Sequence, residues 1–102
     1  IRWGSEELSI PYYSPVDKKM HKYFPDFIAE IKTSDKSIKT YVIEVKPKKQ
    51  TTPPKRKKKK TKSYIHECLM YSVNEAKWKS AEKYCKNNGW DFIILTEDTI
   101  LP

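Results

Sequence analysis

Residues 24–46 read FPDFIAEIK, TSDKS and IKTYVIEVK, which are two strand-like runs separated by five polar residues. Both runs are rich in β-branched and aromatic side chains, which strands favour. The polar segment at 33–37 is short enough to form a hairpin loop. We therefore predict an antiparallel hairpin that turns around Asp35.

A hairpin that is symmetric about Asp35 places Asp26 directly opposite Glu44. Opposed residues share a face of the sheet, with Cβ atoms roughly 4.5–5.5 Å apart. Because side chains alternate along a strand, Lys46 lies on the same face as Glu44. Two carboxylates so close repel each other unless a cation or a proton lies between them. A solvent-facing hairpin with ordinary alternation predicts the same pattern, so both interpretations stay open at this point.

The composition predicts one domain with a core of modest size, since the chain has 102 residues. The sequence begins at Ile1, and we expect that an N-terminal segment is missing from it. There is no apolar run long enough to span a bilayer and no signal-peptide pattern, which predicts a soluble protein. The two cysteines lack metal-ligand spacing and fit a reducing, intracellular setting.

The net charge of +8 is concentrated in one segment. Residues 46–62 hold ten lysines and arginines and no acid, whereas the rest of the chain holds 11 bases and 13 acids. Like charges repel and cannot pack a core, so we predict a flexible basic loop at about 47–63. Such a loop suits the phosphate backbone of DNA. The predicted DNA-binding residues are Lys48, Lys49, Lys55, Arg56, Lys57, Lys58, Lys59 and Lys60, with Gln50 as a further candidate.

The N-terminal part of the chain predicts one more strand. Residues 7–14 alternate, with Leu8, Ile10 and Tyr12 on one face, and Pro11 indicates an edge position or a bulge. Residues 20–23 lead into the strand over 24–32. Because both faces of the 24–46 hairpin are partly apolar, we expect a sheet that is covered on both sides.

The C-terminal part predicts a helix followed by a buried strand. Residues 64–70 indicate a short helix, and the pattern S-x-x-E at 72–75 is a capping box that opens the main helix. Asn88-Gly89 ends that helix, and residues 90–96 form a strongly apolar strand. We therefore predict an α/β fold with a mixed central β-sheet of about four strands and helical cover.

Asp26 and Glu44 are hard oxygen ligands suited to Mg²⁺ or Mn²⁺, and the backbone carbonyl of Val45 offers a third donor. An ion at this position polarises a phosphoryl oxygen and acidifies a bound water. Lys46 can orient that water and offset the charge that builds up on the phosphate. The residues thus favour metal-assisted hydrolysis of a phosphodiester, next to a segment that binds its backbone.

Pro25-Asp26 followed by Glu44-Val45-Lys46 resembles the signature of the PD-(D/E)XK nuclease superfamily. The flanking residues YFPDF and EVKP, together with the helix and strand over 76–97, are similar to the head-completion nucleases of T4-like phages. A more distant similarity is to the TnsA-type transposon endonuclease. The resemblance extends from about Trp3 to Glu97.

The resemblance implies a restriction-endonuclease-like core in which Asp26 and Glu44 bind metal and Lys46 is catalytic. The family's first helix, which often contributes another acid, has no counterpart here. Glu6 and Glu7 are the candidates to replace that acid. The expected products of cleavage carry 5′-phosphate and 3′-hydroxyl ends.

The leading hypothesis is a metal-dependent DNA endonuclease that acts on DNA ends during phage head completion. Its expected partners are DNA and phage head or portal proteins, and its expected location is the host cytoplasm or the virion. The alternatives are a transposase-like or junction-cleaving nuclease, a non-catalytic DNA-binding module that uses the basic loop, and a structural virion protein. The oligomeric state is not predicted.

Overall fold

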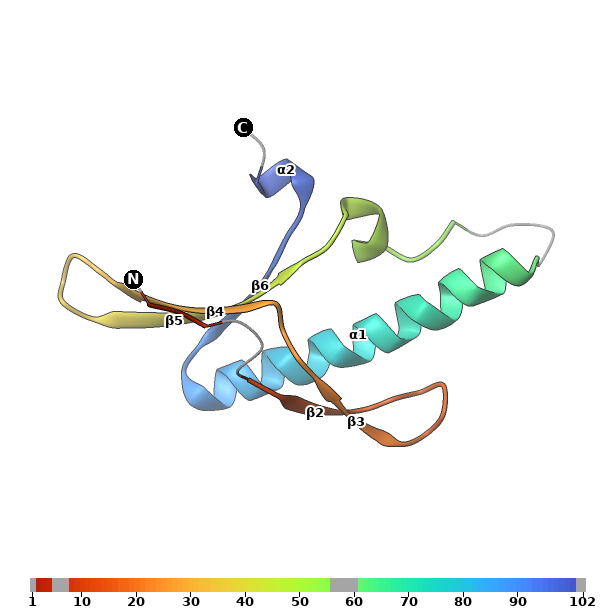
Figure 1. Cartoon of the computed structure of the whole chain (residues 1–102), viewed down its shortest axis with the longest axis horizontal. Helices are drawn as coiled ribbons and strands as arrows, with labels where there is room; N and C mark the ends of the chain where they lie inside the picture. Colours follow the sequence, from red (N-terminus) through yellow and green to blue (C-terminus); the bar gives the residue numbers. More distant parts are fainter. Residues whose placement is uncertain (1, 5–7, 56–60, 101–102) are drawn as a thin grey trace.

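The computed structural model describes residues 2–4, 8–55 and 61–100 (Figure 1). The chain forms an α/β fold, as predicted, with one long helix. The elements in chain order are β1 (Arg2–Gly4), β2 (Ile10–Tyr13), β3 (Met20–Tyr23), β4 (Phe27–Lys32), β5 (Ile38–Val45), the 3-10 turn η1 (Lys48–Thr51), α1 (Lys62–Asn88), β6 (Asp91–Leu95) and α2 (Glu97–Ile100).

The main sheet has four strands in the order β1-β4-β5-β6. The pairs β1–β4 and β4–β5 are antiparallel, whereas β5–β6 is parallel. The parallel pair arises because α1 carries the chain back along the sheet before β6 begins. This arrangement confirms the predicted sheet of mixed direction.

The β4–β5 hairpin has the predicted register. Phe27 pairs with Ile43 and Lys32 pairs with Ile38, so the hairpin is symmetric about Asp35. The Asp35 carboxylate accepts hydrogen bonds from the Thr33 hydroxyl and from the backbone N–H of Ser37. These bonds lower the pKa of Asp35 to about 2. The loop is thus held by its own polar side chains.

The strand predicted over 7–14 does not join the main sheet. Instead β2 pairs with β3 in a separate two-stranded sheet, with Ile10 opposite Tyr23. The strand predicted from Phe24 begins only at Phe27. Pro25 explains this break, because proline has no N–H to donate to a ladder.

The prediction of two helices with a boundary at Ser72 is wrong, because α1 is one helix of 27 residues. It begins after Thr61, whose hydroxyl accepts a hydrogen bond from the backbone N–H of Tyr64. Ser72 lies inside the helix, and its hydroxyl donates to the carbonyl of Leu69. No glycine or proline interrupts residues 62–88, so nothing in the sequence stops the helix at Ser72. Gly89 ends it in the left-handed conformation, as predicted.

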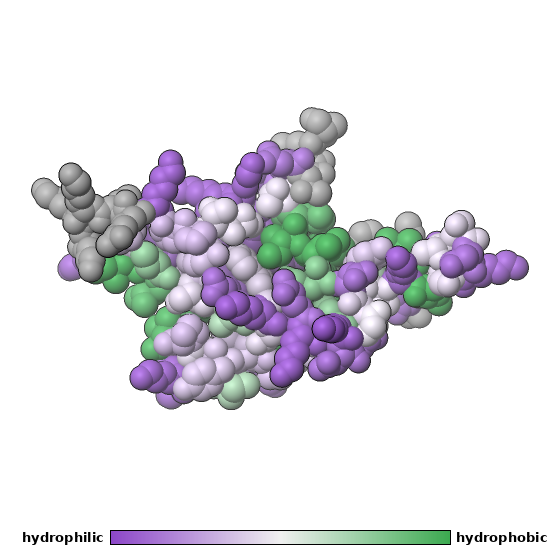
Figure 2. Space-filling view, turned by 180° about the vertical axis from the view of Figure 1, so that it is seen from behind, coloured by the Kyte–Doolittle hydropathy of each residue, from purple (hydrophilic) through white to green (hydrophobic). Residues whose placement is uncertain are grey.

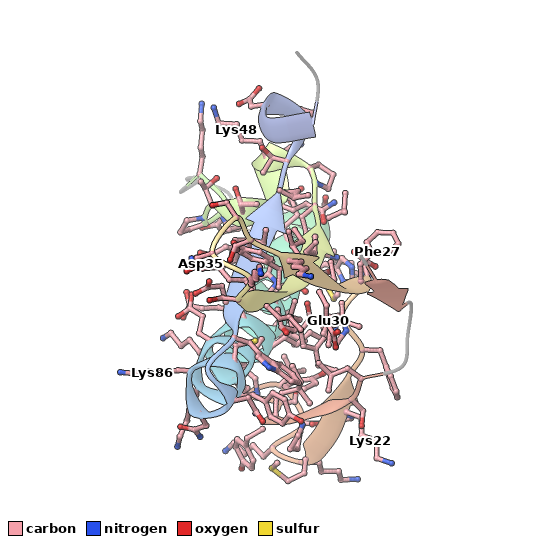
Figure 3. The ribbon with its side chains drawn as sticks, turned by 90° about the vertical axis from the view of Figure 1, so that its left-hand side faces the viewer. Lys22, Phe27, Glu30, Asp35, Lys48 and Lys86 are labelled. Carbon is pink, nitrogen blue, oxygen red and sulfur yellow. The ribbon has the colours of Figure 1, made fainter. Side chains whose placement is uncertain are left out.

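The main core lies between α1 and the β2–β3 sheet. It contains Ile10, Tyr12, Tyr23 and Ala81, which are all buried. Partly buried residues from α1 and from β6 pack against this cluster. Seen with the helix nearly end-on, α1 and the β2–β3 sheet lie on the same side of the main sheet (Figure 3).

The other face of the main sheet is less covered than predicted. Phe27, Val45 and Ile93 share that face and are 36–40% exposed. Within the described parts of the chain, α1 packs on one face only. Ala29 and Ile43 on the same face are buried, so the expected cover on both sides is met only in part.

The molecule is elongated because α1 projects beyond the sheets (Figure 1). The radius of gyration is 15.8 Å, against about 13 Å for a compact domain of this length. Ile65 and Leu69 in the first turns of α1 are more than 40% exposed. The rear view in Figure 2 shows hydrophobic surface along this half of the helix.

Across the described ranges, α1 included, no helix combines the length and the apolar character needed to cross a membrane.

The segment predicted as a loop over 47–63 contains regular structure at both ends. Lys48–Thr51 form η1, in which the backbone N–H of Gln50 bonds to the carbonyl of Pro47. Residues 62 and 63 belong to α1. Residues 56–60 lie outside the described part of the chain.

Gly89→Ala should lower the free energy of unfolding by about 1 kcal/mol, because a residue with a Cβ is strained at positive φ. The φ of Gly89 is +71°, and an added Cβ meets nothing within 4 Å, so the backbone alone causes the loss. Urea unfolding followed by circular dichroism measures the difference. Gly89→Asn should lose less, because asparagine tolerates this conformation. An alanine variant as stable as the original chain would contradict the assignment.

Candidate active site

Asp26 lies at the end of the β4–β5 ladder. The last pair of that ladder is Phe27 with Ile43, and Asp26 and Glu44 are the residues that follow this pair on the two chain segments. Asp26 itself is outside β4, and its Oδ2 accepts a hydrogen bond of 2.8 Å from the backbone N–H of Val45. The Asp26 carboxylate thus replaces the backbone carbonyl that would accept from the Val45 N–H if the ladder continued. This is a correction to the prediction of a strand residue at this position.

The backbone of Val45 faces Asp26. In a strand the N–H and the C=O of one residue point to the same edge. Since the Val45 N–H donates to Asp26, the Val45 carbonyl also points to the edge where β4 has ended. Two oxygen-bearing groups, the Asp26 carboxylate and the Val45 carbonyl, therefore lie on the same edge of β5.

Glu44 is buried, with 5% of its surface exposed, and both of its oxygens have partners. The Tyr23 hydroxyl donates to Oε2 over 2.6 Å. The Lys46 ammonium lies 3.5 Å from Oε1. These contacts compensate part of the cost of removing a carboxylate from water. The structure thus brings Glu44 and Lys46 together, as predicted.

Tyr23 is a site residue that the sequence did not reveal. It is 4% exposed and belongs to β3, so the second sheet supplies it. Burial, and then the hydrogen bond to Glu44, raise the pKa of its hydroxyl well above the usual value. In the sequence, Tyr23 has the pattern of an ordinary core aromatic in an alternating strand. Nothing in that pattern indicates that its hydroxyl donates a hydrogen bond to Glu44.

Lys46 connects the sheet to a cavity of about 420 Å³. Its backbone N–H donates to the carbonyl of Leu95 over 3.0 Å and continues the β5–β6 pairing. Its side chain is 28% exposed and lines the cavity. The other lining residues come from the segment around η1 and from α1: Lys49, Gln50, Thr52, Pro54, His66, Glu67, Met70, Tyr71, Asn74 and Lys77.

The predicted DNA-binding lysines differ in their surroundings. The backbone N–H of Lys48 donates to the Glu97 carboxylate, and its ammonium lies 2.8 Å from Asp98 (Figure 3). The hydrogen bond to Asp98 raises the pKa of Lys48. Its charge is therefore compensated within the chain, whereas Lys49 lines the cavity and Lys55 is exposed.

Several predicted residues cannot be placed in this site. Glu6, Glu7 and the basic run Arg56, Lys57, Lys58, Lys59 and Lys60 lie outside the described residues. In the ranges that are described, no group of three or more histidines, cysteines, aspartates or glutamates is arranged to hold a metal ion. Among the described residues, the acids of the candidate site are Asp26 and Glu44.

Asp26→Ala should lower the free energy of unfolding by about 1 kcal/mol, because the Val45 N–H loses its acceptor. Asp26→Asn keeps an acceptor oxygen and should lose less than about half of that. Chemical denaturation of both variants measures the two values. Equal losses would mean that the hydrogen bond to Val45 does not stabilise the fold.

Comparison with known proteins agrees with the resemblance found in the sequence. Residues 1–97 match the family model described as the TnsA-like endonuclease N terminal. The head completion nuclease of Enterobacteria phage T4 is 40% identical over 102 residues, covering 96% of this chain. The chain spans 65% of the length of that curated relative. No solved structure matches the chain. The match over residues 1–97 shows that the chain belongs to the family of TnsA-like endonuclease N-terminal domains.

Proposed function

We propose that this chain is the catalytic core of a metal-dependent DNA endonuclease with a restriction-endonuclease-like, PD-(D/E)XK-type site. The observation that carries the proposal is the buried Glu44 carboxylate, which lies beside Lys46 at the end of the ladder where Asp26 is fixed. A buried carboxylate next to a cavity with an adjacent lysine is costly for stability, and such groups concentrate at functional sites. Membership of an endonuclease family supports the same conclusion.

The oxygen donors of the site fit Mg²⁺ or Mn²⁺. Asp26 uses only Oδ2 for the Val45 N–H among the described contacts, which leaves Oδ1 for an ion. Glu44 and the Val45 carbonyl are the other proposed ligands. Mg²⁺ usually takes one or two carboxylates and keeps several waters, so this set is sufficient. When bound, the ion would supply an acidified water and neutralise charge on the phosphate.

Lys46 is proposed to orient the attacking water and to stabilise the charge that develops on the phosphate. In the reaction a bond forms between the water oxygen and phosphorus, and the bond from phosphorus to the 3′ oxygen breaks. A proton from the water ends on the 3′ oxygen, so the products carry 5′-phosphate and 3′-hydroxyl ends. The 3.5 Å separation from Glu44 keeps the ammonium at the site.

The basic segment is proposed to hold the DNA backbone. Lys49 and Lys55 are the described candidates, together with the run over 56–60, whereas Lys48 contributes less because Asp98 neutralises it. By analogy with the phage relative, the proposed role is the processing of DNA ends in head completion, in the host cytoplasm or the virion, in contact with head or portal proteins.

A non-catalytic DNA-binding or structural virion protein is the second candidate. It is favoured by the finding that the described part of the site contains two acids only. It predicts DNA binding that depends on salt but not on metal. A transposase-like or junction-cleaving nuclease remains the alternative within the enzyme class.

Asp26→Asn, Glu44→Gln and Lys46→Gln should each reduce DNA cleavage by about 100-fold or more, because each removes a group that acts in the transition state. The assay compares linear and supercoiled DNA with Mg²⁺, with Mn²⁺ and with a chelator. Glu82→Gln, an exposed acid on α1, is the matched control and should cleave normally. Equal cleavage by all four variants would refute the assignment. Metal-independent DNA binding without any cleavage would favour the second candidate.

A further inference from the structure

The cavity beside Lys46 is rich in groups that donate hydrogen bonds. Three lysines line it, from the end of β5, from η1 and from α1, against a single acid, Glu67. Gln50, Thr52 and Asn74 add neutral donors. Asn74 is 8% exposed, so it belongs to the buried part of the wall. With three lysines against one acid, the cavity is electropositive.

Lys77 is the unusual member of this set. Its ammonium lies 5.8 Å from the ring centroids of both Tyr12 and Tyr23, which form part of the core. No carboxylate lies within ion-pair distance of it in the described parts of the chain. Two aromatic faces compensate only part of the cost of desolvating an ammonium. Lys77 is thus a half-buried cation that an incoming anion would stabilise.

The position of the cavity indicates which anion it receives. Lys46 lines the cavity and its ammonium lies 3.5 Å from Glu44, so the cavity adjoins the site around Glu44. A strand whose scissile phosphate lies at Glu44 and Lys46 therefore brings a neighbouring phosphate to the cavity. Tyr71 and Met70 provide an apolar wall of the kind that suits a deoxyribose.

We propose that the cavity is a second phosphate site, in which Lys77 binds a phosphodiester next to the scissile one on the substrate strand. This inference rests on the proposed nuclease function. Lys77 acts by binding and does not take part in the reaction itself. The predicted basic loop is then only one part of the DNA-binding surface, and a helix contributes the other part.

Lys77→Gln should weaken the binding of a duplex oligonucleotide and lower the slope of log affinity against log salt by about one. Fluorescence anisotropy in the presence of a chelator measures this without cleavage. Lys79→Gln is the matched control: it removes the same charge from the same helix, but Lys79 is 74% exposed and paired with Glu75 at 3.2 Å. Its slope should stay within about half a unit of the original. Lys77→Arg keeps the charge and should retain the original slope.

A Lys77→Gln slope equal to that of Lys79→Gln would overturn the phosphate site. If the two slopes were equal and the Lys77→Gln variant still cleaved DNA at the normal rate, the proposed nuclease function would still hold. Conversely, a lowered slope in a protein that cleaves no DNA with either metal would show that Lys77 contacts a phosphate, but it would refute the nuclease and with it the position of that phosphate next to a scissile one. Circular dichroism of each variant shows whether the fold is retained.

A second inference follows from the hydrogen bond between Tyr23 and Glu44. The carboxylate is held on one side by Tyr23 and on the other by Lys46, so its plane is fixed. Tyr23 is itself fixed by its pairing with Ile10 and by burial. We propose that Tyr23 is a positioning residue that presents Glu44 to the metal. This also rests on the proposed function.

Tyr23→Phe should weaken Mn²⁺ binding by about tenfold, because loss of a group that orients a metal ligand typically costs 10–100-fold in affinity. Calorimetric titration with Mn²⁺ in the absence of DNA measures this directly. In cleavage assays of this variant, the metal concentration that gives the half-maximal rate should rise by a larger factor than the maximal rate falls. Tyr13→Phe, at an exposed position on β2, is the control and should bind normally.

Equal Mn²⁺ affinity in the Tyr23→Phe and Tyr13→Phe variants would overturn the positioning role alone. Absence of Mn²⁺ binding by the unaltered protein would instead refute the metal site, and with it this role. The two failures are therefore distinguishable.

Discussion

The burial of the Glu44 carboxylate is the constraint on which the rest of the site depends. A carboxylate with 5% exposure is tolerated only where hydrogen bonds and a countercharge replace its water. Tyr23 and Lys46 supply these from two different sheets. The contact therefore joins the β2–β3 sheet to the main sheet, and the core around α1 holds both in place. Fold and site are linked through one side chain.

The interruption at Pro25-Asp26 has the complementary role. The chain passes from β3 into the main sheet at Pro25, and the β4–β5 ladder can begin only after this proline because it has no N–H to donate. The backbone N–H of Val45 would remain without a partner there, and the Asp26 carboxylate accepts its hydrogen bond. The same two residues thus separate the two sheets and fix an acid at their junction. Both effects arise from a short sequence motif.

The sequence predicted those features that depend on local geometry. The register of the β4–β5 hairpin followed from a symmetric loop around Asp35, and Gly89 ended the helix where its left-handed conformation was expected. It did not predict the pairing of β2 with β3, because β3 and β4 are nearly continuous in sequence. The Ser72 boundary failed because a capping pattern also occurs inside a continuous helix. Tyr23 was missed because a buried tyrosine has the same pattern whether or not its hydroxyl has a partner.

The long α1 helix changes the interpretation of the basic segment. A helix that began at Ser72 would leave His66, Met70 and Tyr71 in a short separate element, with no fixed wall opposite η1. Since α1 begins at Lys62, the residues from His66 to Lys77 belong to one continuous helix and form that wall. Charge alone therefore predicted a flexible loop over 47–63, whereas in the described fold this segment begins with η1 and ends in the first residues of α1. In the proposed function, the helix that packs on the core also determines where the phosphate backbone is held.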